Sequence, residues 1–140
     1  MKEKILVSAC LLGIDCKYSG GNNLNEKVLE YIKDYEVIPV CPEIMGGLST
    51  PRPPSERIGD KVLNNQGTNV TNEYTKGALE TLKLAKLFNV KKALLKAKSP
   101  SCGKGKVYDG TFTSTLIEGN GVTVDLLESN GIEVISEQEL

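Results

Sequence analysis

The chain has 140 residues, 39% hydrophobic and 25% charged, with a net charge of −1, which is an ordinary composition for a soluble globular protein. This length predicts one domain over 1–140, large enough to bury a core without disulfides. There is no His and no Trp, but there are four Cys. The missing His excludes Ser-His-Asp and Cys-His nucleophile systems and every metal site that uses histidine.

The first forty residues predict a strand, a helix and a second strand. An apolar run at 4–9 is typical of a strand buried on both faces. After a loop that contains three glycines, Asn23 or Asn25 caps a helix that ends at about Asp34. The second strand is predicted at 36–40, where Pro39 favours a position at the edge of the sheet.

The rest of the chain continues this alternation after a long loop. The segment 41–59 contains four prolines and predicts a loop, and the turn residues of 60–70 predict a hairpin. Further predictions are helices at 71–89 and 120–130, capped by Thr71 and Asn120, strands at 91–97 and 132–136, and irregular structure at 107–118. Alternating strands and helices indicate one small open α/β domain, a Rossmann-like parallel sheet in three layers.

The sequence predicts no association with a membrane. No apolar run approaches the roughly 18 residues that cross a bilayer. The segment 7–10 resembles a lipoprotein cysteine box, but the apolar stretch before it is far too short for a signal peptide. We therefore expect a cytoplasmic protein, in which cysteines serve as ligands, catalytic thiols or core residues rather than disulfides.

Three of the cysteines follow predicted strands. Cys10, Cys41 and Cys102 lie at or just beyond strand ends, and ligands of open parallel sheets bind beyond the carboxyl ends of strands. We therefore predict that these three thiols share one site, with Cys16 as a fourth member or a neighbour. Such a set suits zinc or an iron–sulfur cluster, and the alternative is a group of unrelated buried thiols.

Polar residues beside these cysteines offer further chemistry. Glu43 is a candidate acid–base group, with a solvated surface carboxylate as the alternative. Candidate site residues around the third strand end and the Pro-rich loop are Lys98, Ser99, Ser101 and Arg52. Arg52, Glu56 and Arg57 either order the Pro-rich loop through ion pairs or contact substrate.

Charge is unevenly distributed along the chain. Residues 76–106 hold nine Lys and one acidic residue, whereas 107–140 hold seven acidic residues and no Lys or Arg. The basic stretch would attract an anionic substrate or RNA, but complementary solvated faces are the favoured interpretation. No phosphate loop and no dinucleotide fingerprint are present, so dinucleotide binding is not expected.

Three separated motifs resemble those of the thiouracil desulfidase family, also known as domain of unknown function 523. They are Ser8-Ala-Cys-Leu-Leu-Gly13 with Cys16-Lys-Tyr-Ser-Gly20, then Pro39-Val-Cys-Pro-Glu43 with Gly46-Gly-Leu48 and Pro51-Arg-Pro-Pro54, and Lys98-Ser-Pro-Ser-Cys-Gly103. The resemblance covers nearly the whole chain. It implies a [4Fe-4S] cluster held by Cys10, Cys41 and Cys102, with one iron free to bind the substrate sulfur and Cys16 outside the ligand set.

The resemblance also implies a reaction and its residues. Sulfur is removed from 2-thiouracil or a related thiolated base or nucleotide without net redox change. Glu43 and Ser101 match catalytic positions, and we expect Lys98, Ser99 and Arg52 to bind substrate. The implied partner is a small thiolated pyrimidine, with thiolated RNA as a second possibility, and the oligomeric state stays open.

Two other function classes compete with this interpretation. One is a non-catalytic iron–sulfur or zinc-binding module in sulfur trafficking or RNA binding. The other is a thiol redox enzyme that uses Cys10 and Cys16, although their spacing differs from the usual C-x-x-C pair.

Overall fold

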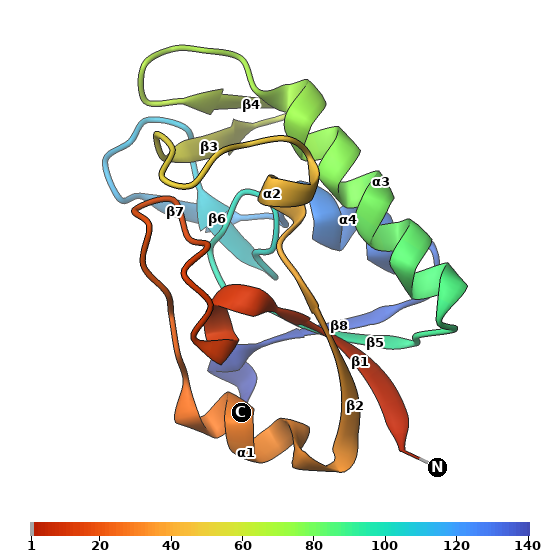
Figure 1. Cartoon of the computed structure of the whole chain (residues 1–140). Coiled ribbons are helices and arrows are strands. Elements are labelled where there is room, and N and C mark those ends of the chain that lie inside the picture. The colour runs from red at the N-terminus through yellow and green to blue at the C-terminus, as the bar shows by residue number, and fades with distance from the viewer. Residues whose placement is uncertain (1) are drawn as a thin grey trace.

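A four-stranded parallel sheet forms the centre of the computed structural model, which describes residues 2–140 (Figure 1). Its strands are β1 (Glu3–Ser8), β2 (Tyr35–Val40), β5 (Lys92–Leu95) and β8 (Glu133–Ser136), in the order β2–β1–β5–β8. β2 is an edge strand, as Pro39 predicts, because proline has no N–H to donate to a second neighbour. The predicted parallel α/β architecture is confirmed.

Helices cover both faces of the sheet, which makes three layers (Figure 1). α1 (Glu26–Tyr31) packs on one face, and α3 (Thr71–Leu87) and α4 (Val122–Ser129) pack on the other. Along β1, Ile5 and Val7 join the apolar cluster under α1, whereas Leu6 joins the cluster under α3 and α4. This alternation follows from the two-residue period of a strand and buries both faces.

The caps of these helices follow the sequence only in part. Asn25 caps α1 as predicted, and its side chain accepts hydrogen bonds from two backbone N–H groups of the first turn. Thr71 was expected to cap α3, but the N-cap is Val70, because the Thr71 hydroxyl accepts the N–H of Val62 instead. The predicted Asn120 cap of α4 is also wrong: Gly121 is the N-cap.

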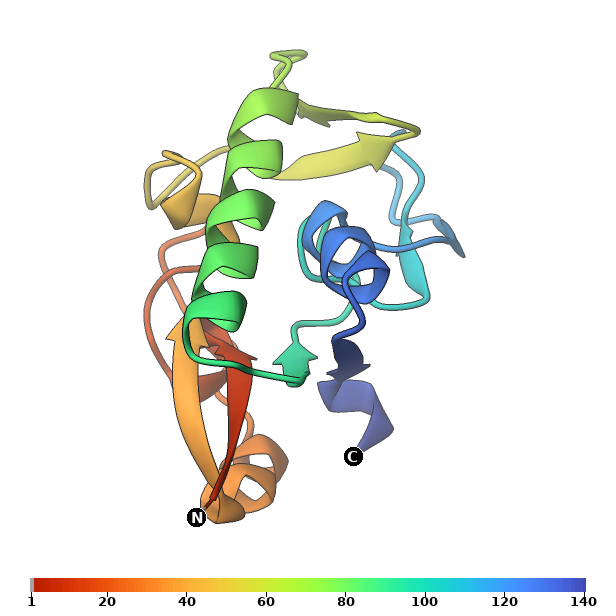
Figure 2. The same cartoon turned by 90° about the vertical axis from the view of Figure 1, so that its right-hand side faces the viewer.

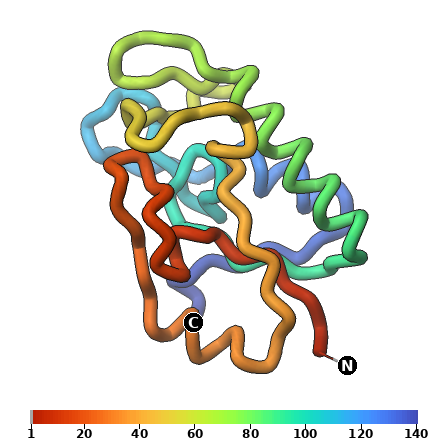
Figure 3. The backbone as a smooth tube through the Cα atoms, in the orientation of Figure 1, coloured from red at the N-terminus to blue at the C-terminus, as the bar shows by residue number. Residues whose placement is uncertain are grey.

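Several short elements lie beyond the carboxyl ends of β1 and β2 (Figures 2 and 3). They are a 3₁₀ turn at Ala9–Leu12, the helix α2 (Pro42–Met45), the hairpin β3 (Ser55–Ile58) with β4 (Lys61–Asn64), and the hairpin β6 (Lys106–Tyr108) with β7 (Leu116–Glu118). The first hairpin overlaps the predicted one but begins earlier, and the second occupies a segment predicted to be irregular. These elements surround the end of the sheet where the strand-end cysteines lie.

Ion pairs join the lysine-rich stretch to the acidic C-terminal segment. Lys92 pairs with Glu133 at 3.9 Å, Lys96 pairs with Glu137 at 3.1 Å, and Lys104 pairs with Glu128. This pattern is the one expected of complementary charged faces. Within residues 2–140, no helix is long and apolar enough to cross a membrane.

Candidate functional site

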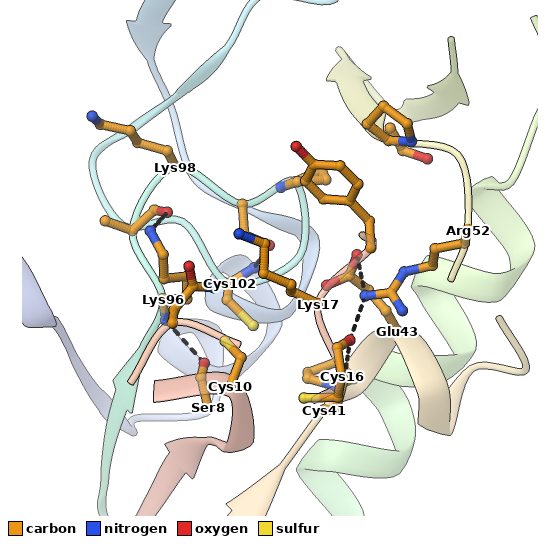
Figure 4. Close-up of a pocket in the computed structure, with 18 of the residues that line it drawn as sticks. Ser8, Cys10, Cys16, Lys17, Cys41, Glu43, Arg52, Lys96, Lys98 and Cys102 are labelled. Atoms are coloured by element: carbon orange, nitrogen blue, oxygen red, sulfur yellow. Dashed lines mark hydrogen bonds and ion pairs between the residues drawn. The ribbon is translucent and has the colours of Figure 1, made fainter. Parts of the chain in front are cut away.

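A cavity of about 390 Å³ opens at the carboxyl ends of the central strands, and all four cysteines line it (Figure 4). Cys10 lies in the 3₁₀ turn after β1, Cys41 is the N-cap of α2 after β2, and Cys102 follows β5. The structure thus brings together the three strand-end cysteines, as the parallel arrangement requires. The cavity has the size of a small-molecule site, for which roughly 300–1,000 Å³ is typical.

Cys16 lies in the same cavity wall, where its backbone is firmly held. Its carbonyl oxygen accepts a 3.0 Å hydrogen bond from Nη2 of Arg52 and a 3.8 Å contact from the Cys41 thiol. The side chain is almost fully buried. The structure therefore places Cys16 beside the other three thiols, and its backbone carbonyl makes two of the contacts that hold it there.

The surroundings of three of the thiols disfavour their thiolate forms. Burial raises the pKa of Cys10, Cys16 and Cys102, that of Cys16 to about 12, and neighbouring thiolate charges raise all three further. The charge of Glu43 raises the pKa of Cys10 and Cys102 as well. The charges of Lys96 and Arg52 lower the pKa of Cys10 and Cys16 respectively, and a bound metal centre would stabilise the thiolates further.

Two polar side chains of the cavity wall lower the pKa of individual thiols instead. A hydrogen bond from Asn23 lowers the pKa of Cys10, and a hydrogen bond from Ser8 lowers that of Cys102. Ser8 also accepts the backbone N–H of Lys96 at 2.9 Å, which ties β1 to the segment after β5. Both interactions favour the thiolate forms.

Glu43 stands in the first turn of α2 with its two oxygens in different surroundings. Oε2 accepts a 2.8 Å hydrogen bond from the hydroxyl of Tyr74 and lies 3.4 Å from Nη2 of Arg52. Oε1 has no hydrogen-bond partner among the described residues. Burial raises the pKa of Tyr74, and so do the charge and hydrogen bond of Glu43, so this phenol stays protonated as a donor. One carboxylate oxygen is thus anchored and the other is free to act.

Arg52 connects the Pro-rich loop to the cavity wall, and its side chain is only 5% exposed. Nη1 donates to the carbonyl of Ser49 and to the hydroxyl of Thr50. Nη2 donates to the carbonyl of Cys16 and forms an ion pair with Glu43. Its guanidinium is therefore largely occupied by the protein itself (Figure 4).

The ion-pair network predicted for Arg52, Glu56 and Arg57 does not form in residues 2–140. Arg57 instead pairs with Asp125 on α4 at 2.6 Å. Glu56 accepts backbone N–H groups from the β6–β7 turn. Glu56 and Arg57 point to different elements because they are neighbours in β3, which alternates its side chains between opposite faces, and Arg52 precedes this strand.

The segment before Cys102 divides its residues between the cavity and the interior. Lys98 and Ser99 line the cavity, and the Ser99 hydroxyl accepts the backbone N–H groups of Ser101 and Cys102 at 3.1 and 3.0 Å. Ser101 is fully buried, and its hydroxyl shares a 2.8 Å hydrogen bond with Thr123 of α4. Ser101 thus lies behind the wall that Cys102 faces.

Several cavity residues were not predicted as site residues from the sequence. They are Ser8, Lys17, Asn23, Tyr74, Lys96, Tyr108 and Phe112. Ser8 precedes Cys10 by two positions, so strand alternation was a usable signal for it. Tyr74 fits the apolar face of α3 and Phe112 lies in a segment without periodicity, so no local pattern marks either one.

The cysteine geometry argues against a site for a single metal ion. Within residues 2–140, no three Cys, Asp or Glu side chains are close enough to hold one ion. A four-iron cluster spaces its ligating sulfurs more widely than a single ion does, because each sulfur binds a different iron. The all-sulfur donor set of this cavity fits an iron–sulfur cluster, which cysteine thiolates hold.

Known proteins resemble this chain over nearly its whole length. Residues 5–139 match the family model described as 2-thiouracil desulfurase. The uncharacterized protein YbbK of Bacillus subtilis (strain 168) is 44% identical over 146 residues, with 97% of each chain covered. A solved structure of the [4Fe-4S]-dependent thiouracil desulfidase TudS superposes with a TM-score of 0.92 at 43% identity, covering 99% of this chain and 93% of that one.

Proposed function

The chain belongs to the 2-thiouracil desulfurase family, and we propose that it hydrolyses the thiocarbonyl of 2-thiouracil or a related thiolated pyrimidine. The observation that carries this proposal is one cavity shared by three strand-end cysteines and a carboxylate with one unpaired oxygen. The overall change is C=S + H₂O → C=O + H₂S, in which no atom changes oxidation state.

We assign the ligands of a [4Fe-4S] cluster to Cys10, Cys41 and Cys102. The donor set fits, because iron–sulfur clusters are held by thiolates and these thiols share one cavity. When bound, such a cluster supplies an iron without a protein ligand, a Lewis acid suited to the sulfur of a thiocarbonyl. Asn23 and Ser8 lower the pKa of two of the proposed ligands, Cys10 and Cys102, as outer polar partners commonly do in metal sites.

Glu43 is the proposed acid–base residue. Its free Oε1 takes a proton from the attacking water and gives it to the departing sulfur, which leaves as HS−. As the carbonyl forms, Oε1 takes the second water proton and releases it to the solvent, where it completes H₂S. Tyr74 and Arg52 hold Oε2 in place, which leaves Oε1 as the oxygen available to water. This arrangement performs the acid–base work that histidine often performs elsewhere.

Substrate binding is assigned to the wall around Lys98 and Ser99, with Arg52 acting through Glu43 and Cys16. We propose that Ser101 acts by fixing the turn that carries Cys102, since its hydroxyl bonds Thr123. The cavity volume favours a free base or nucleoside, and Lys17, Lys96 and Lys98 make a thiolated RNA the second substrate class to test.

Anaerobic reconstitution tests the proposal directly. The protein is loaded with iron and sulfide, supplied with 2-thiouracil, and assayed for sulfide and uracil. We expect about four irons per chain and equal amounts of the two products. A protein that takes up no iron contradicts the proposal, and one that holds a cluster without releasing sulfide is a binding module. The four free cysteines favour a reducing compartment, and we propose the cytoplasm.

A further inference from the structure

The β6–β7 hairpin contributes an aromatic wall to the cavity that the proposed chemistry does not use. Tyr108 and Phe112 line the cavity from this hairpin, and Phe112 is 38% exposed. Four of the seven aromatic residues of the chain line the cavity: Tyr18, Tyr74, Tyr108 and Phe112. Phe112 differs from the other three because it has no hydroxyl, so its ring can offer only a flat apolar face.

The backbone of Phe112 is held in an uncommon conformation. Its φ of 58° lies in the left-handed region, which bulky side chains rarely adopt and which costs free energy. Left-handed backbone recurs nearby at Gly110, where an added Cβ would overlap the side chain of Ile58. A half-exposed aromatic ring on such a backbone needs a specific anchor to stay in one place.

Glu56 of β3 provides that anchor. The single atom Oε1 accepts the N–H of Gly110 at 2.9 Å and the N–H of Phe112 at 3.1 Å, and the residue is only 9% exposed. Hydrogen bonds between a carboxylate and backbone N–H groups are among the stronger ones in proteins. Both bonds close on residues whose φ is left-handed, so they offset the strain and hold the backbone that carries the ring.

We propose that Phe112 is a specificity-determining residue that stacks on the planar ring of the substrate, and that Glu56 is the positioning residue that holds it. The inference rests on the proposed function, because it takes a pyrimidine as the substrate. A flat aromatic face stabilises a flat heterocycle and discriminates against a puckered ring of the same composition. In this arrangement the cysteines and Glu43 act on the thiocarbonyl group, while Phe112 recognises the ring that carries this group.

Uracil binding tests the ring contact apart from turnover, because uracil has no sulfur to bind iron. Calorimetric titration of the cluster-loaded protein compares wild type, Phe112→Leu, which keeps apolar bulk, and Phe112→Tyr, which keeps the ring. We expect the Kd for uracil to rise about tenfold in Phe112→Leu and to change less than about twofold in Phe112→Tyr. Equal affinity in wild type and Phe112→Leu overturns the proposal.

Substrate discrimination gives a second readout. 5,6-Dihydro-2-thiouracil keeps the thiourea fragment but has a puckered, non-aromatic ring. We expect Phe112→Leu to raise KM for 2-thiouracil about tenfold and to leave KM for the dihydro compound within about twofold. Equal losses on both compounds would show a structural role only and overturn the proposal. Absence of sulfide release by the wild type, with uracil binding still weakened by Phe112→Leu, would refute the proposed function alone.

The role of Glu56 is tested by two variants with different acceptor capacity. Glu56→Gln keeps an oxygen that can accept both N–H groups, whereas Glu56→Ala removes it. We expect Glu56→Ala to raise KM as Phe112→Leu does, with unchanged iron content, and Glu56→Gln to restore it. The double variant should be no worse than Phe112→Leu alone. Additive effects, or loss of iron in Glu56→Ala, would overturn the positioning role.

Discussion

The hydroxyl of Tyr74 on α3 donates a 2.8 Å hydrogen bond to Oε2 of Glu43 on α2, across 31 positions of sequence. This bond, with the guanidinium of Arg52, determines which oxygen of Glu43 faces the cavity. The proposed proton transfers therefore depend on a tyrosine that lies outside the three cysteine-containing sequence motifs.

Removing this hydroxyl should slow turnover without removing the cluster. Tyr74→Phe keeps the ring but releases Oε2, and we expect kcat to fall about tenfold, as for a lost hydrogen bond to a charged group. In Glu43→Gln we expect kcat to fall further, by about 10²–10³-fold. Steady-state sulfide release and iron content measure both effects. Tyr35→Phe is the matched control outside the cavity, and an equal loss there would contradict this role of Tyr74.

The cysteine variants should separate Cys16 from the other three. Cys10→Ser, Cys41→Ser and Cys102→Ser each remove a proposed ligand, and we expect each to lose iron after anaerobic reconstitution. Cys16→Ser should keep it, because the contacts from Arg52 and the Cys41 thiol go to the backbone carbonyl, which serine retains. Iron and sulfide analysis with the visible absorption of the cluster is the measurement. Loss of iron in Cys16→Ser would place Cys16 among the ligands.

The predictable part of this site follows from the parallel sheet. Apolar runs locate β1, β2 and β5, and a parallel arrangement brings their carboxyl ends to one edge, so the convergence of Cys10, Cys41 and Cys102 needs no distance information. The edge position of β2 is similarly readable, because Pro39 lacks a donor.

The remaining part depends on contacts between segments that are distant in sequence. The bonds from Gly110 and Phe112 to Glu56 span 54 and 56 positions, and nothing in either segment identifies its partner. α2 has only four residues, too few to show a helical period. Thr71 looks like a cap in sequence, but the neighbouring β4 strand offers its hydroxyl a different donor.

Close contact between α2 and α3 should make two glycines irreplaceable. A Cβ on Gly46 would overlap the carbonyl of Glu73, and a Cβ on Gly77 would overlap the carbonyl of Pro42, so neither backbone can yield cheaply. We expect Gly46→Ala and Gly77→Ala each to lower the free energy of unfolding by about 3 kcal/mol. Urea denaturation measures this. Gly21→Ala, where an added Cβ meets only ordinary contacts, is the control and should stay within about 0.5 kcal/mol.

The Ser101–Thr123 hydrogen bond allows the proposed role of Ser101 to be separated from direct catalysis. Ser101→Ala and Thr123→Val each leave one buried hydroxyl without its 2.8 Å partner, and we expect each to cost about 1–3 kcal/mol of stability. The double variant should cost less than the sum, since it removes both ends of one bond. Urea denaturation of the two single variants and the double variant measures this double-mutant cycle.

Turnover of the same variants then decides how Ser101 contributes to the reaction. If Ser101 acts by fixing the turn before Cys102, loosening that turn from either side has the same result, so Thr123→Val should lower kcat as much as Ser101→Ala does. Neither Ser101 nor Thr123 lines the cavity, so both are expected to act through the position of Cys102. A loss of more than about tenfold in Ser101→Ala beyond that in Thr123→Val would assign the Ser101 hydroxyl to the reaction itself.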